Sequence, residues 1–180
     1  MTAAIRVGTA DAAAIAATRH RLGEILIDCV EHGASVGFLA PLEPADADAY
    51  WQRIERAVGD GRCVLLLAAA EDGAVVGTVQ LDVDTLPNQP HRATVSKLLV
   101  HTDARRRGVG EALMAELERV ALGAGRWLLT LDTATADAVR LYERMGWTAS
   151  GAIPKYALNP DGSLTATTFY WKELSGGLQA

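Results

Sequence analysis

The sequence predicts a mixed α/β fold, with a mostly antiparallel central sheet of about six or seven strands flanked by helices. Two observations predict it. The apolar runs 63–70 and 74–81 flank a Glu-Asp-Gly turn at 71–73, a pattern typical of an antiparallel hairpin. The apolar runs 92–100 and 127–132 are instead separated by a glycine-containing loop and an amphipathic helix, which indicates a right-handed crossover connection. Antiparallel strands followed by a strand–helix–strand unit give a mixed sheet.

Before this hairpin the sequence predicts one short strand and two helices. Asp11 is a residue type that caps helices, and the apolar residues after it recur at helical spacing. Gly59 and Gly61 end the second helix. The expected elements are a strand at 5–7, a helix from Asp11 to about His32, a packed apolar loop at 33–42, and a helix from Asp46 or Asp48 to about Val58.

Beyond the hairpin, strands and helices alternate. Pro87 and Pro90 break the chain before the next strand, and the Asn-Pro-Asp-Gly segment 159–162 predicts a tight turn. The crossover places the glycine loop at the carboxyl end of a central strand. The expected elements are strands at 92–100 and 127–132, helices from Gly108 to about Leu122 and at 137–145, a strand entered through 147–150, and a last strand at 165–174.

Length and composition indicate one domain spanning residues 1–180. The 180 residues are 49% hydrophobic and 22% charged, which is ordinary for a globular domain. A net charge of −5 argues against nucleic-acid binding. Cys29 and Cys63 stand alone in apolar surroundings, which indicates core thiols in a reducing compartment. The longest apolar run, 63–70, is too short to cross a bilayer, and no signal-peptide pattern opens the sequence, so we expect a cytoplasmic chain that does not bind membranes.

The strongest functional signal is the segment 105–110, Arg-Arg-Arg-Gly-Val-Gly. It lies between a predicted strand and a predicted helix, where backbone N–H groups and the helix dipole favour an anion. A nucleotide P-loop would need a Gly-Lys-Ser/Thr ending, which the chain lacks. A dinucleotide fingerprint would need a glycine at the position of Leu113. The loop therefore predicts a pyrophosphate site of another kind.

Three motifs together resemble the GNAT superfamily of N-acetyltransferases, over roughly residues 63–150. They are the 105–110 loop, which fits Arg/Gln-x-x-Gly-x-Gly/Ala, the Leu-Asp-Thr segment 131–133, and Leu-Tyr-Glu-x-x-Gly-Trp at 141–147. The resemblance implies a sheet splayed between two central parallel strands. It also implies that acetyl-coenzyme A, as co-substrate, places its pantetheine arm in that opening and its pyrophosphate in the loop. The cofactor-binding residues that it implies are Leu98, Leu99, Val100, Arg105, Arg106, Arg107, Gly108, Val109, Gly110 and Glu111.

The resemblance implies direct acetyl transfer to an amine, with Tyr142 as general acid towards the sulfur; the alternative is that Tyr142 is half-buried core. Asp132, at the end of a predicted strand, is a candidate general base acting through water, or else a cap of the next helix. Many relatives carry an acidic residue on the preceding strand, but Thr94 or Ser96 occupies that place here and cannot act as a base. His91 is a further candidate base or an ordinary surface residue.

Recognition of the acceptor is assigned to the first helix, the loop after it and the second helix. The candidates are Asp28, Ser35, Phe38 and Trp51. Asp28 could pair with an ammonium group or lie on a solvated helix face, and Trp51 could belong to the core. The segments 26–30, 33–38 and 156–162 resemble the branch of the family that contains the tabtoxin-resistance acetyltransferase. This resemblance implies a small amino-acid-like acceptor and a role in resistance.

Two other functions stay open at this stage. One is acetylation of a protein lysine or amino terminus, and the other is non-catalytic binding of acyl-coenzyme A. The apolar loop 33–42 and the C-terminal hairpin favour a closed site for a small-molecule amine over an open peptide groove. The histidines have no partners at metal-ligand spacing, so no metal site is expected. The chain could be a monomer or a homodimer.

Overall fold

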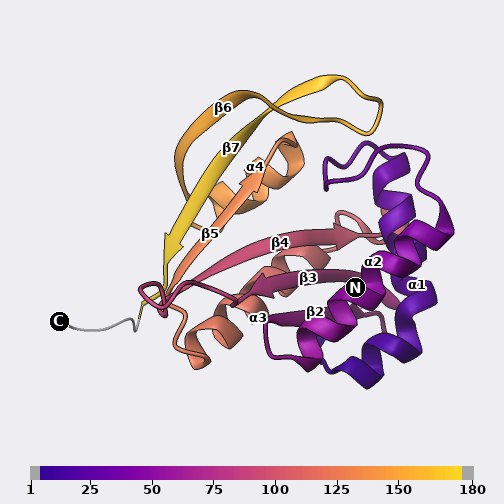
Figure 1. Cartoon of the computed structure of the whole chain (residues 1–180), viewed down its shortest axis with the longest axis horizontal. Coiled ribbons are helices and arrows are strands. Elements are labelled where there is room, and N and C mark those ends of the chain that lie inside the picture. Colours follow the sequence, from indigo (N-terminus) through magenta and orange to yellow (C-terminus); the bar gives the residue numbers. More distant parts are fainter. Residues whose placement is uncertain (1–4, 176–180) are drawn as a thin grey trace.

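The computed structural model describes residues 5–175 and contains a seven-stranded sheet in the order β1-β2-β3-β4-β5-β7-β6 (Figure 1). Neighbouring strands are antiparallel except β4 and β5, which are parallel. The predicted mixed, mostly antiparallel sheet is therefore confirmed. The strands are β1 Arg6–Ala10, β2 Cys63–Ala69, β3 Val75–Asp82, β4 Arg92–Val100, β5 Leu128–Thr133, β6 Thr148–Leu158 and β7 Leu164–Glu173.

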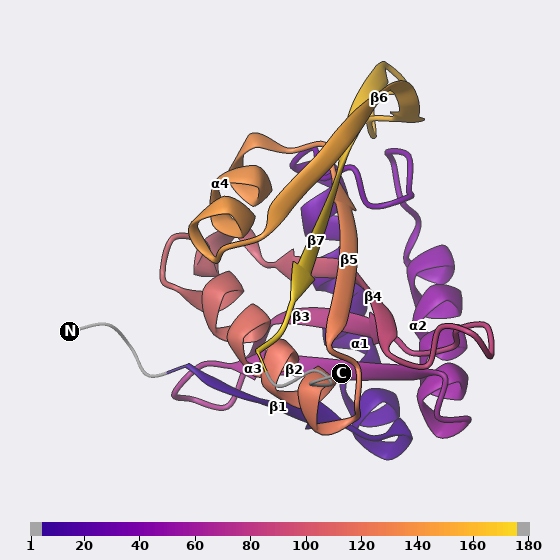
Figure 2. The same cartoon turned by 90° about the vertical axis from the view of Figure 1, so that its left-hand side faces the viewer.

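Helices cover both faces of the sheet (Figure 2). One face carries α1 and α2, whose core includes Leu26 and Trp51. The opposite face carries α3 and α4, whose core includes Leu113 and Tyr142. Because successive strand residues point to opposite faces, the core that a strand residue joins tells which face it lies on. The helices are α1 Ala12–Glu31, α2 Pro44–Gly59, the single-turn 3₁₀ helix η1 Thr102–Ala104, α3 Val109–Gly123 and α4 Ala136–Arg144.

The observed element boundaries agree closely with those predicted from the sequence, with two exceptions. The Asp11 side chain accepts a 2.8 Å hydrogen bond from Ala14 N and begins α1, as predicted. Helix α2 begins at Pro44, two residues before the earlier predicted start, because proline is well suited to the first helical turn. Strand β1 runs to Ala10, beyond the predicted 5–7, because it pairs with β2 over its whole length.

The loop between α1 and α2 is joined to the tip of the β6–β7 hairpin. Ala40 N donates a 2.9 Å hydrogen bond to Pro160 O, and Ser35 Oγ donates to Leu158 O at 3.5 Å. Figure 1 shows the two segments side by side at the upper right of the molecule. The chain therefore forms an arch of two distant segments at the end of the molecule that holds the hairpin tip.

Candidate active site

Strands β4 and β5 pair at one end and separate towards the other. Their register joins Arg92–Leu128, Ala93–Leu129 and Thr94–Thr130, and the two threonine hydroxyls lie 3.3 Å apart. β4 then continues along β3, and β5 continues along β7. The predicted separation of two central parallel strands is present, and the carboxyl ends of β4 and β5 lie on either side of it.

A β-bulge changes the face on which β4 displays its side chains. Thr78 pairs with Leu99 and Gln80 with Ser96, so β4 carries one extra residue opposite Val79. Before the bulge, Ala93 and Val95 belong to the core under α3, whereas Leu99 after it belongs to the core under α1 and α2. Lys97 lies at the bulge with φ of 52°. The bulge therefore turns odd-numbered positions from the α3 face to the α1 and α2 face.

The Lys97 ammonium group lies on this second face, beside α2 and the loop that precedes it. Nζ is 5.9 Å from the centroid of the Tyr50 ring, and a Cβ added to Gly37 would lie 3.7 Å from Nζ. Burial lowers the pKa of Lys97, and the Asp132 carboxylate opposes part of that change. Lys97 and Tyr50 were missed by the sequence reasoning, although a single lysine within an apolar strand was a usable signal.

Asp132 and Tyr142 approach the strand separation from opposite faces. Leu131 points into the core under α3 and α4, so the exposed Asp132 next to it points to the face that carries α1 and α2. Tyr142 lies on α4, is 6% exposed and packs against the rings of Trp147 and Tyr170. Burial raises the pKa of Tyr142, and the charge of Asp132 raises it further. The tyrosine therefore keeps its proton at neutral pH, within electrostatic reach of the aspartate.

Asp132 does not cap the helix that follows it. The N-cap of α4 is Thr135, which makes no side-chain capping bond, and Thr135 N donates to Thr133 Oγ1 at 3.3 Å. The Tyr142 ring belongs to the core, as one of the two interpretations from the sequence expected, while the role of its hydroxyl as general acid stays a prediction.

The glycine loop leads directly into the amino terminus of α3. Gly108 is the N-cap with φ of 81°, and it supplies no side-chain cap, so the first N–H groups of α3 lack a partner within the helix. A Cβ added to Gly108 would meet nothing within 4 Å, so the left-handed φ and not crowding explains the glycine. This arrangement fits a pyrophosphate. Gly110 has a different reason to be glycine, because a Cβ there would lie 3.3 Å from Leu141 Cδ2.

The three arginines of the loop are not equivalent. Arg105 turns back to the sheet, where Nε donates to Val100 O at 3.1 Å and a terminal nitrogen lies 3.8 Å from Cys29 Sγ. Arg106, at φ of 58°, and Arg107 are exposed. The Glu111 carboxylate pairs with Arg144 of α4 at 3.2 Å. Only Arg106 and Arg107 among the three arginines are thus turned to solvent without a bond inside the described chain.

The predicted backbone contacts of the pantetheine arm lie where the strands separate. Leu98 and Val100 pack against the core under α3, and Leu99 is 1% exposed in the opposite core. The Val100 carbonyl already accepts bonds from Arg105 Nε and, at 3.5 Å, from Cys29 Sγ. This carbonyl is therefore less available to a ligand than the backbone of Leu98 and Leu99.

The structure brings only part of the predicted acceptor set to the site. Phe38 is half-buried, with its ring 5.3 Å from the ring of Tyr50 in an edge-on arrangement, and Lys97 Nζ lies 5.9 Å from the same Tyr50 ring. Ser35 lies farther along the arch, bonded to Leu158. Trp51 is 0% exposed and offers no surface to a ligand, because it fills the core between α1, α2 and the sheet.

Asp28 serves a structural contact instead of facing solvent. Its carboxylate accepts two 2.8 Å hydrogen bonds from Thr102, one from the backbone N–H and one from the hydroxyl. The side chain is 13% exposed, with His32 and His101 on either side at 3.3 and 3.9 Å. Both carboxylate oxygens are thus occupied, and Asp28 ties α1 to the start of η1, just before the 105–110 loop.

His91 lies at the wrong end of the strands for a catalytic base. Its ring stacks on Trp127 at 4.7 Å, and its carbonyl accepts from Leu128 N, so it belongs to the paired end of β4 and β5. Asp132 lies five residues beyond Trp127, about 16 Å away at the rise of an extended strand. Thr94 and Ser96 lie nearer the separation but carry only hydroxyl groups.

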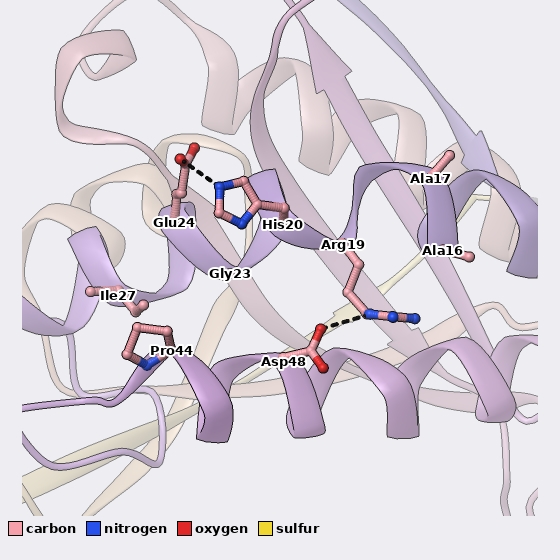
Figure 3. Close-up of a pocket in the computed structure, with 9 residues that line it drawn as sticks. All are labelled: Ala16, Ala17, Arg19, His20, Gly23, Glu24, Ile27, Pro44 and Asp48. Atoms are coloured by element: carbon pink, nitrogen blue, oxygen red, sulfur yellow. Dashed lines mark hydrogen bonds and ion pairs between the residues drawn. The ribbon is translucent and has the colours of Figure 1, made fainter.

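A hollow of about 340 Å³ lies elsewhere, between α1 and α2 (Figure 3). Across it, Arg19 Nε donates a 2.7 Å hydrogen bond to the Asp48 carboxylate, and His20 Nε2 lies 3.3 Å from a Glu24 carboxylate oxygen. Its charged groups therefore pair with one another, and none of the predicted site residues lines it. It is a gap in the packing between two helices, and none of the candidate catalytic residues named above lines it.

Within residues 5–175, no group of three or more His, Cys, Asp or Glu side chains is placed where it could hold a metal ion. None of the helices in that range has the length and hydropathy needed to cross a membrane.

Comparison with known proteins adds an independent observation. The model of the acetyltransferase (GNAT) family matches residues 19–147. The L-amino acid N-acetyltransferase AaaT of Escherichia coli K12 is 34% identical over 118 residues, which cover 64% of this chain and 70% of that protein.

Solved structures agree in fold. The phosphinothricin acetyltransferase Pat of Sinorhizobium meliloti, in complex with AcCoA, matches with a TM-score of 0.78 at 22% identity, over 100% of this chain and 92% of that one. A GCN5-related N-acetyltransferase from Kribbella flavida matches with a TM-score of 0.76 at 22% identity, over 95% and 98% of the two chains.

Proposed function

The chain belongs to the acetyltransferase (GNAT) family, and from this premise we propose that it transfers the acetyl group of acetyl-coenzyme A directly to the amino group of a small molecule. It is an acyltransferase, and acetyl-coenzyme A is its co-substrate. The observation that carries the proposal is the uncapped amino terminus of α3 beside the separated ends of β4 and β5, with Asp132 close enough to Tyr142 to raise the pKa of its hydroxyl.

The donor site is assigned to the uncapped amino terminus of α3 and to the backbone at the strand separation. The first N–H groups of α3, from Val109 to Glu111, hold the pyrophosphate, with Arg106 and Arg107 adding positive charge. The backbone of Leu98 and Leu99 holds the pantetheine arm. Bound acetyl-coenzyme A supplies an activated acetyl thioester. Much of the rate acceleration then comes from holding the amine against it.

Proton transfer is divided between two residues on opposite faces. The amine attacks only as the free base, so Asp132 accepts the proton of the incoming ammonium group, directly or through water. Tyr142 donates a proton to the departing thiolate. The raised pKa of Tyr142, caused by burial and by Asp132, keeps this donor protonated.

Neither cysteine is arranged as a nucleophile. Cys29 and Cys63 are both buried free thiols, and burial raises the pKa of each. The Cys29 thiol is bonded to Val100 O. A raised pKa disfavours the thiolate that nucleophilic attack requires, which supports direct transfer without an acyl-enzyme. Buried reduced thiols also fit a reducing compartment, and we place the enzyme in the cytoplasm.

The arch supports a small acceptor over a protein substrate. The loop between α1 and α2 is hydrogen-bonded to the hairpin tip through Ala40 and Pro160, so a peptide could not lie there as an extended strand without breaking that bond. The amino-acid acetyltransferase relative supports an amino-acid-like acceptor. The resemblance to the tabtoxin-resistance branch points the same way and suggests a resistance role.

Isothermal titration with acetyl-coenzyme A tests the donor site, and release of free coenzyme A with a panel of amines tests the reaction. We expect saturable binding and amine-dependent release of the thiol. Absence of binding at high micromolar acetyl-coenzyme A would refute the proposal. Binding without release with any small amine or peptide would instead indicate a non-catalytic acyl-coenzyme A domain, and release with peptides alone would indicate a protein acetyltransferase.

A further inference from the structure

We propose that Lys97 binds an anionic group of the acceptor, so that the enzyme selects amines that carry a carboxylate next to the amino group. This inference rests on the proposed function, because it concerns the acceptor side of the same site. It identifies a specificity residue and a substrate class: amino acids and close analogues, in preference to neutral or polycationic amines.

The Lys97 ammonium group lies on the side of the sheet where the acceptor is expected. The bulge in β4 turns Lys97 to the face that carries α2, where Asp132 also points. This face is opposite to the one on which α3 presents its amino terminus to the pyrophosphate. A cation placed here lies on the acceptor side of the strand separation and is not needed by the phosphate groups of the donor.

The Lys97 side chain is partly buried, and its ammonium group has gained no carboxylate partner among the described residues. Its surroundings are the Tyr50 ring and the backbone of Gly37, and burial is the main influence on its pKa. Across residues 5–175, no carboxylate lies within ion-pair distance of Nζ. A cation removed from water is costly unless it is paired, so the site favours an anion brought by the ligand.

The backbone at Lys97 has an unfavourable conformation. A lysine at φ of 52° occupies the left-handed region, which is unfavourable for a residue with a Cβ. Such strain persists where the surrounding structure holds it, and it concentrates at functional sites. Here it accompanies the bulge that aims the side chain at the acceptor face.

The charges of Lys97 and Asp132 complement those of a zwitterionic acceptor. Lys97 and Asp132 are close enough to influence each other electrostatically but do not form an ion pair. A zwitterionic amino acid can place its carboxylate at Lys97 and its ammonium at Asp132, which then accepts the proton before attack. A polyamine or a basic peptide would instead bring a second positive charge to Lys97 and be repelled.

The test compares wild type with Lys97→Met, using L-amino acids and their carboxamides as acceptors. We expect wild type to favour each amino acid over its carboxamide in kcat/KM. Lys97→Met should reduce kcat/KM about 10- to 100-fold for the amino acids and less than about threefold for the carboxamides. Differences in amine basicity between acid and amide cancel, because each acceptor is compared with itself across the two enzymes.

Controls separate recognition from folding. Titration with acetyl-coenzyme A and a thermal melt should give the same values for Lys97→Met as for wild type, and Lys97→Arg should restore part of the preference. Lys155→Met is the matched control, since Lys155 also has a positive φ, 55°, but is exposed on β6; its preference should not change.

Two results would overturn the inference while leaving the proposed function intact: equal use of acids and carboxamides by wild type, or an equal loss for both acceptors in Lys97→Met. A wild-type enzyme that releases no coenzyme A with any acceptor would defeat the proposed function itself.

Discussion

Replacing Asp28 with alanine tests how the phosphate-binding loop is held in place. Asp28 lies near the end of α1, and Thr102 lies in η1, immediately before the arginine and glycine residues of the loop. Two 2.8 Å hydrogen bonds join them. Alanine removes both acceptors and leaves the backbone N–H and the hydroxyl of Thr102 without partners. We expect a less stable protein that also binds acetyl-coenzyme A more weakly.

The size of the effect follows from the two bonds. A hydrogen bond to a charged group contributes about 1.5–3 kcal/mol, so two contribute about 3–6 kcal/mol before relaxation. The Asp28 side chain is 13% exposed, which lets water replace part of the lost contact. We therefore expect a loss of about 2–4 kcal/mol in the free energy of unfolding.

Urea unfolding measures this loss at pH 7, where a lower midpoint at unchanged slope reports stability alone. Asp48→Ala is the matched control, because Asp48 is also a helix aspartate in an ion pair but is 47% exposed. Its loss should be much smaller than that of Asp28→Ala, because a solvent-exposed ion pair contributes little to stability. A similar small loss for both variants would refute the reasoning that Asp28 anchors the loop.

The pH dependence provides a second check on Asp28. Burial, the largest influence, raises its pKa, but the bonds from Thr102 and the neighbouring histidines lower it more, so the pKa lies below its usual value. A carboxyl whose pKa is lower in the folded state stabilises above its unfolded pKa, about 3.9, and loses that contribution as pH falls through the folded value. The difference between wild type and Asp28→Ala should therefore be complete at neutral pH and shrink below about pH 4.

Three further substitutions test the site and the sheet. Tyr142→Phe should lower kcat about 10- to 100-fold with little change in acetyl-coenzyme A affinity, since only the proton donor is lost; equal loss in titration and turnover would indicate a structural tyrosine. Asp132→Asn should lower kcat/KM about 100-fold or more, because the amide cannot accept the proton, and near-wild-type rates across pH 6–9 would remove Asp132 as the base. Gly77→Ala should lower stability by about 1–3 kcal/mol in thermal melts, because its Cβ would lie 2.9 Å from Leu99 O. Gly8→Ala, where a Cβ meets nothing within 4 Å, is the control and should be close to neutral.

Much of the fold was predictable from local patterns in the sequence. β4 begins and ends where the apolar run 92–100 predicts, and α1 begins after the predicted Asp11 cap, because alternation, helical spacing and capping act within a few residues. The family motifs likewise led from sequence to the acetyltransferase family, because the loop 105–110 and the segment 141–147 are contiguous.

Features that depend on distant contacts were not predictable in the same way. Asp28 and Thr102 are 74 residues apart, so their bond cannot be seen in either segment alone. The sequence gives Arg105 the same predicted role as Arg106 and Arg107, but in the fold its guanidinium group donates to the Val100 carbonyl and lies 3.8 Å from Cys29 Sγ. Trp51 was considered for the acceptor site, and only the packing of α1 on α2 shows that it is enclosed.

The sequence by itself determined the class of fold, the order of its elements and the place of the 105–110 loop before α3, because hydrophobic periodicity, turn residues and glycine act locally. Only the tertiary structure decided which side of the sheet each part of β4 serves. Simple alternation places residues 93, 95, 97 and 99 on one face. The pairing with β3 inserts one extra residue, and Lys97 and Leu99 turn to the face that carries α1 and α2. That register is set by a neighbouring strand, and it places the partly buried Lys97 ammonium group on the face of the sheet to which Asp132 also points.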